Sequence, residues 1–334
     1  MKTCDFLKSS SLRLRRAGVD SAQLDAELIL AHVLSKSREW LLAHVDEEIT
    51  PEILKQVQDD IGRRLSGEPL VYITGKKEFY GREFIITPDV LIPRPETEQI
   101  IELLAPQTHP AKHEKVSVAK PIDPDRAVRV TRGGAAPKNV LFVEQKFLGA
   151  DRAAGPEHPE DEMGFAKPHI LDIGTGSGVI AVTLALELPS AHVFASDISE
   201  PALKIAKQNA ETLSAEVEFI KSDLLQNICN KNFDIIVANL PYVDKNWSWL
   251  DKSALAHEPE IALFTEDNGL ELIKRLIRQA PAHLNTNGVL VLELDPCQMS
   301  VVKKYAEKHG FDVVNEQPFC LVLQRRNCET AKHK

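Results

Sequence analysis

Between residues 168 and 324, short apolar runs alternate with segments of helical period, and this alternation constrains the fold more than any other feature of the chain. Short apolar runs predict buried strands, and the amphipathic segments between them predict helices. Repeated strand–helix–strand units build a largely parallel sheet with right-handed crossovers. The sequence therefore predicts an α/β domain over 168–326, with strands at 169–173, 192–196, 217–220, 233–238, 288–294, 311–316 and 319–324, and helices at 178–188, 201–213, 271–282 and 296–309.

The first hundred residues follow a different pattern. Residues 5–66 carry apolar side chains at helical spacing, and Pro51 after Thr50 is typical of a helix start. We expect a small helical domain over 1–68. Residues 69–104 then predict a β-hairpin that turns at Gly81, followed by a helix that begins at Pro95.

The segment 105–167 interrupts this organisation. It holds seven of the chain's twenty prolines, ten basic and nine acidic residues, and no stretch of sustained helical period. Long segments of this kind are usually linkers or disordered insertions. We expect a disordered or extended insertion, the alternative being a small partner-binding element around 139–148, and we expect a short tail at 327–334.

Composition and charge exclude several classes of protein. The 334 residues carry 40 basic and 49 acidic side chains, and this net charge of −9 disfavours a protein that coats nucleic acid through phosphate contacts. The chain has no apolar run long enough for a membrane helix and no signal-peptide core, so we expect a cytoplasmic protein. We also expect it to be a monomer. The five cysteines form no CxxC pair and the eleven histidines form no ligand cluster, so no metal is expected.

The loop after the first strand of the α/β domain is rich in glycine. After Asp172 and Ile173 the chain runs through Gly174, Thr175, Gly176, Ser177 and Gly178 into the next expected helix. Glycines at alternate positions let the backbone turn sharply and approach a ligand closely. The pattern is typical of a site for a nucleotide-like cofactor, although a tight strand-to-helix turn without a ligand has the same glycines.

Acidic residues follow the next two strands. Asp197 lies 21 residues beyond Gly176, where a carboxylate can accept both ribose hydroxyls of an adenosine. Asp223 and Leu224 follow the third strand and can reach an adenine edge, although a lone aspartate at such a position is more often a solvated cap. A dinucleotide such as NAD would use the same residues, but the spacing is GxGxG and not GxGxxG.

The fourth strand ends in the tetrapeptide Asn239-Leu240-Pro241-Tyr242. Pro241 forces Leu240 out of the helical region, which can turn the Leu240 carbonyl toward a ligand. That carbonyl and the Asn239 side-chain oxygen can accept the two hydrogens of a planar NH2 group, and the Tyr242 ring can stack on its plane. Taken alone the tetrapeptide is also compatible with a plain turn. At this place in the strand order, it predicts a site that orients a weakly nucleophilic nitrogen.

These motifs resemble those of a known family. ILDIGTGSG, SDIS and NLPY are similar to class I S-adenosylmethionine-dependent methyltransferases that act on planar amino nitrogens. LIPRPETE at 91–98, preceded by GEPLVYITGKKEFYG and a helical domain, and HEPEIAL at 257–263 narrow the resemblance to the release factor glutamine methyltransferases, the PrmC or HemK family. It covers about 1–104 and 168–326, and it implies a Rossmann-like, mostly parallel seven-stranded sheet with an N-terminal helical bundle.

The resemblance also implies an activity. The substrate would be the glutamine of the GGQ motif in peptide chain release factors, methylated on its amide nitrogen (N5) from S-adenosylmethionine and docked by the N-terminal domain. No stable nucleic-acid or membrane binding is implied. The cofactor-binding residues would be Gly174, Thr175, Gly176, Ser177, Gly178, Asp197, Leu224 and Asn239. Asp172, whose carboxylate suits the sulfonium and amino group of this cofactor, and Asp223 are further cofactor-binding candidates. The catalytic residues would be Asn239, Pro241 and Tyr242, and the substrate-binding residues would be Asn239, Leu240, Pro241 and Tyr242. Arg94 and Glu96 are further substrate-site candidates that can brace the site, although Glu96 fits a plain helix-start role equally well.

Three features depart from the family pattern: Leu240 replaces a proline, Asp295 stands where glycine is usual, and the segment 105–167 is unusually long. Asn-Leu-Pro-Tyr is the form seen in ribosomal RNA adenine dimethyltransferases. The alternatives are therefore an rRNA adenine N6-methyltransferase, another amino-methyltransferase, or a degenerate domain that only binds. The order of the domains, PRPETE and the negative charge favour the release factor enzymes. Trp247 and Trp249 can either cover the site or serve in packing.

Overall fold

Two units make up the part of the chain that the computed structural model describes, which is residues 1–105, 167–248, 250 and 255–327. The first unit holds Met1–Lys77, Ile86–Pro88 and 255–257, and the other described residues form the second. The expected insertion lies outside the described residues except for its two end positions. Trp249 and the tail beyond residue 327 also lie outside them.

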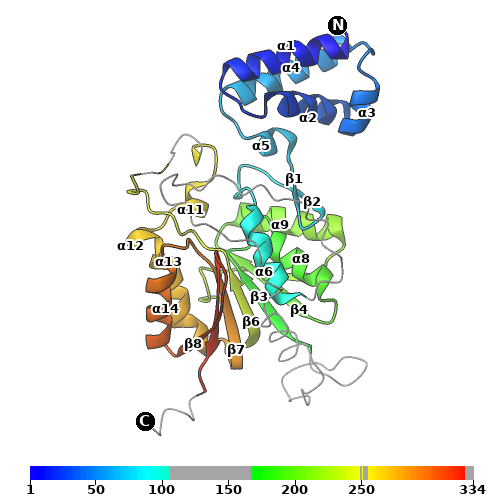
Figure 1. Ribbon diagram of the computed structural model, residues 1–334. Coiled ribbons are helices and arrows are strands. Elements are labelled where there is room, and N and C mark those ends of the chain that lie inside the picture. The colour runs from blue at the N-terminus through cyan, green and yellow to red at the C-terminus, as the bar shows by residue number, and fades with distance from the viewer. Residues whose placement is uncertain (106–166, 249, 251–254, 328–334) are drawn as a thin grey trace, which may run out of the picture. The chain divides into compact units, whose positions relative to one another are not determined.

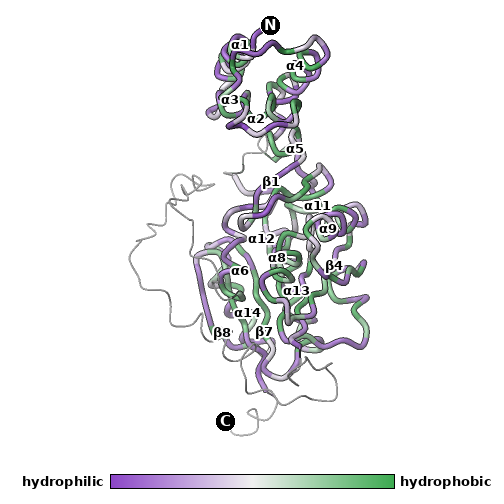
Figure 2. The backbone as a smooth tube through the Cα atoms, turned by 90° about the vertical axis from the view of Figure 1, so that its right-hand side faces the viewer, coloured by the Kyte–Doolittle hydropathy of each residue, from purple (hydrophilic) through white to green (hydrophobic). Residues whose placement is uncertain are grey.

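Helices form the first unit, and Figure 2 shows hydrophobic (green) and hydrophilic (purple) residues interleaved along them. Their bounds are α1 (Thr3–Arg16), α2 (Ala22–Leu34), α3 (Arg38–Ala43), α4 (Pro51–Leu65) and α5 (Leu70–Thr74). The amphipathic faces meet in a core that contains Phe6, Leu14, Ile29, Leu30, Leu41 and Ile61. The α4 helix begins at Pro51 as the sequence predicts, and Thr50 Oγ1 accepts a hydrogen bond from the Ile53 N–H at 3.4 Å.

A two-stranded sheet and a short helix precede the α/β domain along the chain. The strands β1 (Lys76–Phe79) and β2 (Arg82–Ile85) pair with each other, and the chain turns between them at Tyr80 and Gly81. The helix expected from Pro95 is divided: its first turn is the 3-10 helix η1 (Pro95–Thr97), and α6 (Glu98–Leu104) follows. The helical segment therefore begins at Pro95 and ends at Leu104 as expected, with a 3-10 first turn that the sequence did not indicate.

A mostly parallel seven-stranded sheet forms the centre of the second unit, which confirms the predicted fold class (Figure 1). Its strand order is β5-β4-β3-β6-β7-β9-β8. The bounds are β3 (His169–Ile173), β4 (His192–Asp197), β5 (Val217–Lys221), β6 (Phe233–Ala238), β7 (Leu284–Glu293), β8 (Phe311–Glu316) and β9 (Cys320–Arg325). The first five strands pair in parallel, whereas β9 runs antiparallel to both β7 and β8.

Helices cover both faces of this sheet. Figure 1 shows α6, α8 and α9 on one face, and α13 and α14 on the other. The bounds are α8 (Val179–Glu187), α9 (Glu200–Leu213), α11 (Glu260–Leu263), α12 (Glu266–Gly269), α13 (Glu271–Gln279), η4 (Ala280–Ala282) and α14 (Met299–Lys308). The helix expected from Pro296 starts only at Met299, because Asp295 forms a turn first: its Oδ1 accepts the Cys297 N–H at 2.8 Å.

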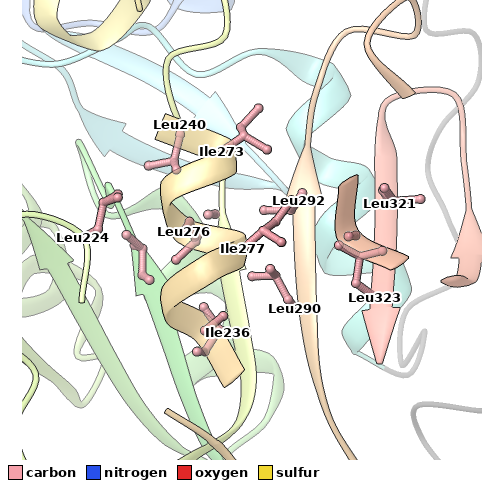
Figure 3. Close-up of a cluster of buried hydrophobic side chains, with 14 of the residues drawn as sticks. Leu224, Ile236, Leu240, Ile273, Leu276, Ile277, Leu290, Leu292, Leu321 and Leu323 are labelled. Atoms are coloured by element: carbon pink, nitrogen blue, oxygen red, sulfur yellow. The ribbon is translucent and has the colours of Figure 1, made fainter. Parts of the chain in front are cut away.

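The α13 side of the sheet is packed by aliphatic side chains. Figure 3 shows α13 contributing Ile273, Leu276 and Ile277, which meet side chains of the strands such as Ile236 and Leu290. These residues are buried because both faces of a largely parallel sheet are covered by helices, and such strands read as nearly continuous apolar runs. This packing fixes the strand ends, whose loops carry the polar residues of the predicted site.

The strand order creates a crevice at one end of the sheet. From β3 the chain moves outward to β4 and β5, and then crosses to β6 on the other side of β3. Ligands of open α/β sheets bind at such a reversal, beyond the carboxyl ends of the strands. Among the described residues, the structure contains no helix long and apolar enough to cross a membrane.

Candidate functional site

A cavity of about 250 Å³ lies at the reversal point, within the second unit. The loops after β3, β4, β5 and β6 contribute to its wall, together with parts of 89–97 and side chains near α11 and α13. The sequence-predicted site residues that line it are Arg94, Gly174, Thr175, Gly176, Ser177, Asp197, Asp223, Leu224, Asn239, Leu240 and Pro241. The other predicted residues, which do not line it, are Asp172, Gly178, Glu96 and Tyr242.

The glycine-rich loop is held in place by its neighbours. Gly178 has φ +83°, and a Cβ atom at this position would lie 3.0 Å from the Cβ of Ala206 on α9. Only glycine therefore allows α8 to start so close to α9. The buried side chain of Asn209 donates from Nδ2 to the Ser177 carbonyl at 2.9 Å and further fixes the loop.

Asp172 lies beneath this loop and has no exposed surface. Thr175 Oγ1 donates to its Oδ2 at 2.6 Å, whereas Oδ1 has no hydrogen-bond partner among the described residues. Burial raises the pKa of Asp172 to about 7, although the hydrogen bond from Thr175 acts in the opposite direction. Its direct contact with a cofactor stays a prediction, because the cavity wall does not include it.

Asp197 ends β4 and faces the cavity with two backbone-anchored oxygens. Its Oδ2 accepts the Gly176 N–H at 2.9 Å, and its Oδ1 accepts the Ser199 N–H at 2.8 Å. Each carboxylate oxygen can accept more than one hydrogen bond, so both remain able to bind a hydroxyl group. The carboxylate is thereby oriented for a vicinal diol such as a ribose.

Asp223 and Leu224 follow β5 and have different surroundings. The Asp223 carboxylate forms an ion pair with Arg275 of α13 at 2.7 Å and accepts a hydrogen bond from Gln226 at 2.9 Å. Leu224 has φ +49° and is buried in the hydrophobic cluster. Both residues line the cavity, and their proposed contact with an adenine ring stays a prediction.

Asn239 follows β6 directly and lies on the cavity wall. Its Nδ2 donates a hydrogen bond to Thr97 Oγ1 at 3.2 Å. A side-chain amide has one oxygen and one NH2 group on opposite sides, so a fixed Nδ2 also fixes the direction of Oδ1. Asn239 is therefore able to present an oriented acceptor.

The next residues of the tetrapeptide are anchored by packing. Figure 3 shows Leu240 in the hydrophobic cluster together with Leu224 and Ile273, and Leu240 is only 5% exposed. A buried leucine can thus hold the loop where the family has a rigid proline. Tyr242 packs against the same cluster, and its carbonyl accepts a hydrogen bond from Gln298 Nε2 at 2.9 Å. Its stacking on a substrate stays a prediction.

Arg94 and Glu96 behave differently from each other. The Arg94 guanidinium forms an ion pair with Glu258, whose buried carboxylate also accepts the Ile92 N–H at 3.1 Å. Arg94 reaches the cavity wall, but Glu96 does not. The pair connects the segment that carries PRPETE to the segment that leads into α11, so Arg94 contributes to the shape of the cavity.

Sequence reasoning missed three residues of this region. Thr97 lines the cavity and contacts Asn239, Glu293 is buried at the end of β7, and Gln298 fixes the Tyr242 carbonyl. The signal for Glu293 was a carboxylate in an otherwise apolar strand, because such residues are almost never fully buried unless they are paired. Thr97 lies in the LIPRPETE motif, but the motif assigned it no role, and the sequence held no comparable signal for Gln298.

The residues present fit an adenosine-containing cofactor. The site combines a glycine-rich turn that leaves room for a ligand, a carboxylate oriented for two hydroxyls, and the buried oxygen of Asp172 without a partner among the described residues. The wall around them is mostly apolar, as is common in small-molecule sites.

Two family models match the chain. The first, described as the PrmC N-terminal domain, matches residues 5–75. The second, described as a methyltransferase small domain, matches residues 160–253 and so includes the glycine-rich loop, Asp197 and Asn239.

Curated relatives match most of the chain. A release factor glutamine methyltransferase of Koribacter versatilis is 35% identical over 86% of this chain and 84% of its own length. One from Bacillus cereus is 32% identical over 92% of this chain and 91% of its own length. A bifunctional methyltransferase of Rickettsia conorii is 34% identical over 92% of this chain, but the chain spans only 54% of that protein.

Proposed function

Since this chain belongs to the release factor glutamine methyltransferase family, we propose that it transfers a methyl group from S-adenosylmethionine to the amide nitrogen of a release factor glutamine. The observation that carries the proposal is the position of Asn239. It lies on the same cavity wall as the glycine-rich loop and Asp197, and its Nδ2 is bound to Thr97. A substrate amide held there would lie next to the proposed cofactor site. The relevant glutamine would be that of the GGQ motif.

The residues of the chain divide into two tasks. Asp197 would hold the ribose of the cofactor, and the glycine-rich loop would pack against it. Asn239 Oδ1 and the Leu240 carbonyl would accept the two N–H groups of the glutamine amide, which orients the nitrogen lone pair. Held by Asp197 and the glycine-rich loop, S-adenosylmethionine would supply an electrophilic methyl group with a neutral thioether as leaving group, and the amide nitrogen would release its proton to water.

Other parts of the proposal rest on the family. We propose that the N-terminal helical unit, which matches the PrmC N-terminal domain model, docks the release factor. The protein would act in the cytoplasm, where release factors work, and as a monomer.

The substrate is tested by offering the protein a choice. The protein is incubated with methyl-labelled S-adenosylmethionine and a release factor, a release factor whose GGQ glutamine is replaced by alanine, or ribosomal RNA. We expect label in the first sample alone. Label in the RNA, or equal label in both release factors, would contradict the proposal, and the first of these results would favour the adenine N6-methyltransferase alternative.

The proposed ribose contact predicts a second result. Asp197→Asn should weaken S-adenosylmethionine binding by roughly 10- to 100-fold, because hydrogen bonds to charged groups contribute about 1.5–3 kcal/mol. Titration calorimetry measures the affinity. Glu200→Gln is the matched control, since this nearby carboxylate is exposed and pairs with Lys221 at the surface. Equal affinities of the two variants would remove Asp197 from the cofactor site.

A further inference from the structure

Three polar side chains from distant parts of the chain meet at the cavity wall, where Thr97 and Asn239 line the cavity and Glu293 lies behind them. Thr97 ends η1, Asn239 follows β6, and Glu293 ends β7. Asn239 Nδ2 lies 3.2 Å from Thr97 Oγ1, and the Glu293 carboxylate accepts hydrogen bonds from both Thr97 and Asn239. Thr97 and Glu293 are each 2% exposed, so water does not compete for these bonds.

The donors and acceptors of these three side chains determine the direction of each hydrogen bond between them. An ionised carboxylate only accepts hydrogen bonds, so the Thr97 hydroxyl must donate its hydrogen to Glu293. The Thr97 oxygen is then free to accept from Asn239 Nδ2. Both hydrogens of the Asn239 amide are thus directed at Thr97 and Glu293, and its Oδ1 is left for another partner.

We propose that Thr97 and Glu293 are positioning residues that hold the Asn239 amide with its oxygen available to the substrate. This inference rests on the proposed function, because it assigns the residues that orient the amide acceptor in that reaction. The reversed Asn239 amide would present N–H groups to the N–H groups of the glutamine, and two donors cannot pair. The orientation of the Asn239 amide therefore decides whether the glutamine nitrogen is aligned for methyl transfer.

The protonation state of Glu293 decides whether this arrangement persists. Burial raises the pKa of Glu293 to about 7, and repulsion from Glu96 adds to this, whereas Arg94 and the bonds from Thr97 and Asn239 act in the opposite direction. Its Oε2 has no partner among the described residues and can receive the proton. The other titratable groups that interact with it are Tyr242 and Cys320, whose own pKa values are raised by burial, so both stay neutral near pH 7.

A protonated Glu293 can donate a hydrogen bond, which favours the reversed amide with Oδ1 toward Glu293. The ionised form predominates above the pKa, so activity should rise as the pH increases through about 7 and reach a plateau above it. The glutamine amide itself does not titrate in this range. Asp172, whose pKa is also raised to about 7, and Asp197, whose pKa is raised by burial, are other described groups in this region that can produce such a step.

The test measures kcat, KM for the release factor and cofactor affinity in three threonine variants. Thr97→Val keeps the shape of the side chain and removes the hydroxyl, Thr97→Ser keeps the hydroxyl, and Thr183→Val is the matched control. Thr183 is fully buried on α8, and its hydroxyl has no hydrogen-bond partner among the described residues. We expect kcat to fall roughly tenfold in Thr97→Val, with cofactor affinity and KM unchanged and with Thr97→Ser and Thr183→Val close to the wild type.

A pH profile of kcat for the wild type and Glu293→Gln completes the experiment. We expect the step near pH 7 in the wild type and its loss in Glu293→Gln, which cannot ionise. A step that persists in Glu293→Gln would belong to another group, such as Asp172 or Asp197, and would overturn the inference. A Thr97→Val kcat equal to that of Thr183→Val would overturn it too. A wild-type protein that does not methylate the release factor would instead refute the proposed function.

Discussion

Replacing Asn239 with alanine is expected to lower kcat by roughly 100- to 1,000-fold while leaving S-adenosylmethionine affinity nearly unchanged. The alanine variant keeps the backbone after β6 but loses the Asn239 side-chain oxygen from the cavity wall. The Tyr242 hydroxyl cannot replace it, because Tyr242 does not line the cavity. The glutamine amide would then keep only the Leu240 carbonyl as an acceptor, and most of the advantage of orientation would be lost. Single-turnover kinetics with labelled cofactor measure the chemical step, and calorimetry measures the cofactor affinity.

Asn246→Ala is the control for this change, because Asn246 lies seven residues further along the same loop and its side chain is exposed. It should leave both quantities at the wild-type level. The contradicting result is an Asn239→Ala variant that binds the cofactor more weakly and has a normal kcat at saturating cofactor. Asn239 would then be a cofactor-binding residue, and the glutamine would have to be held by other groups.

The sequence was informative about the sheet because each central strand is buried on both faces. The strand expected at 233–238 appears with the same bounds as β6, since an apolar run that ends at Asn239 leaves little choice of boundary. The boundary of β7 was less well predicted: the strand begins at Leu284, four residues before the expected start at 288. That extension contains polar residues such as Asn285 and Asn287, so the hydrophobic pattern does not predict it.

The sequence was equally informative about residues that follow a strand. Asp197 and Asn239 end up on one cavity wall because parallel strands bring their carboxyl ends to the same edge of the sheet. Thr97 and Glu293 could not be paired in this way. One belongs to a 3-10 turn and the other to a strand end, and their contact with Asn239 depends on tertiary packing that leaves no local periodicity.

The loop that carries Tyr242 depends on an equally non-local contact. Gln298 Nε2 donates to the Tyr242 carbonyl at 2.9 Å and to the Asn268 carbonyl at 3.0 Å, and so connects this loop to the end of α12. The next residue, Gly269, has φ +80°, and a Cβ atom there would lie 2.0 Å from the Tyr242 oxygen. No side chain can be accommodated at that distance unless the loop moves.

Gly269→Ala should therefore destabilise the protein by about 3 kcal/mol or more, through a left-handed backbone cost of about 1–2 kcal/mol and an overpacking cost of about 1–3 kcal/mol. Because the loop that moves includes Tyr242, kcat should also fall in the fraction that remains folded. Denaturant unfolding and steady-state kinetics measure the two effects.

Gly310→Ala is the matched control: Gly310 has φ +87°, but no atom lies within 4 Å of its would-be Cβ, so only the backbone cost applies. Equal destabilisation in the two variants would show that the close approach to Tyr242 costs nothing, and an unchanged kcat in Gly269→Ala would separate the position of this loop from catalysis.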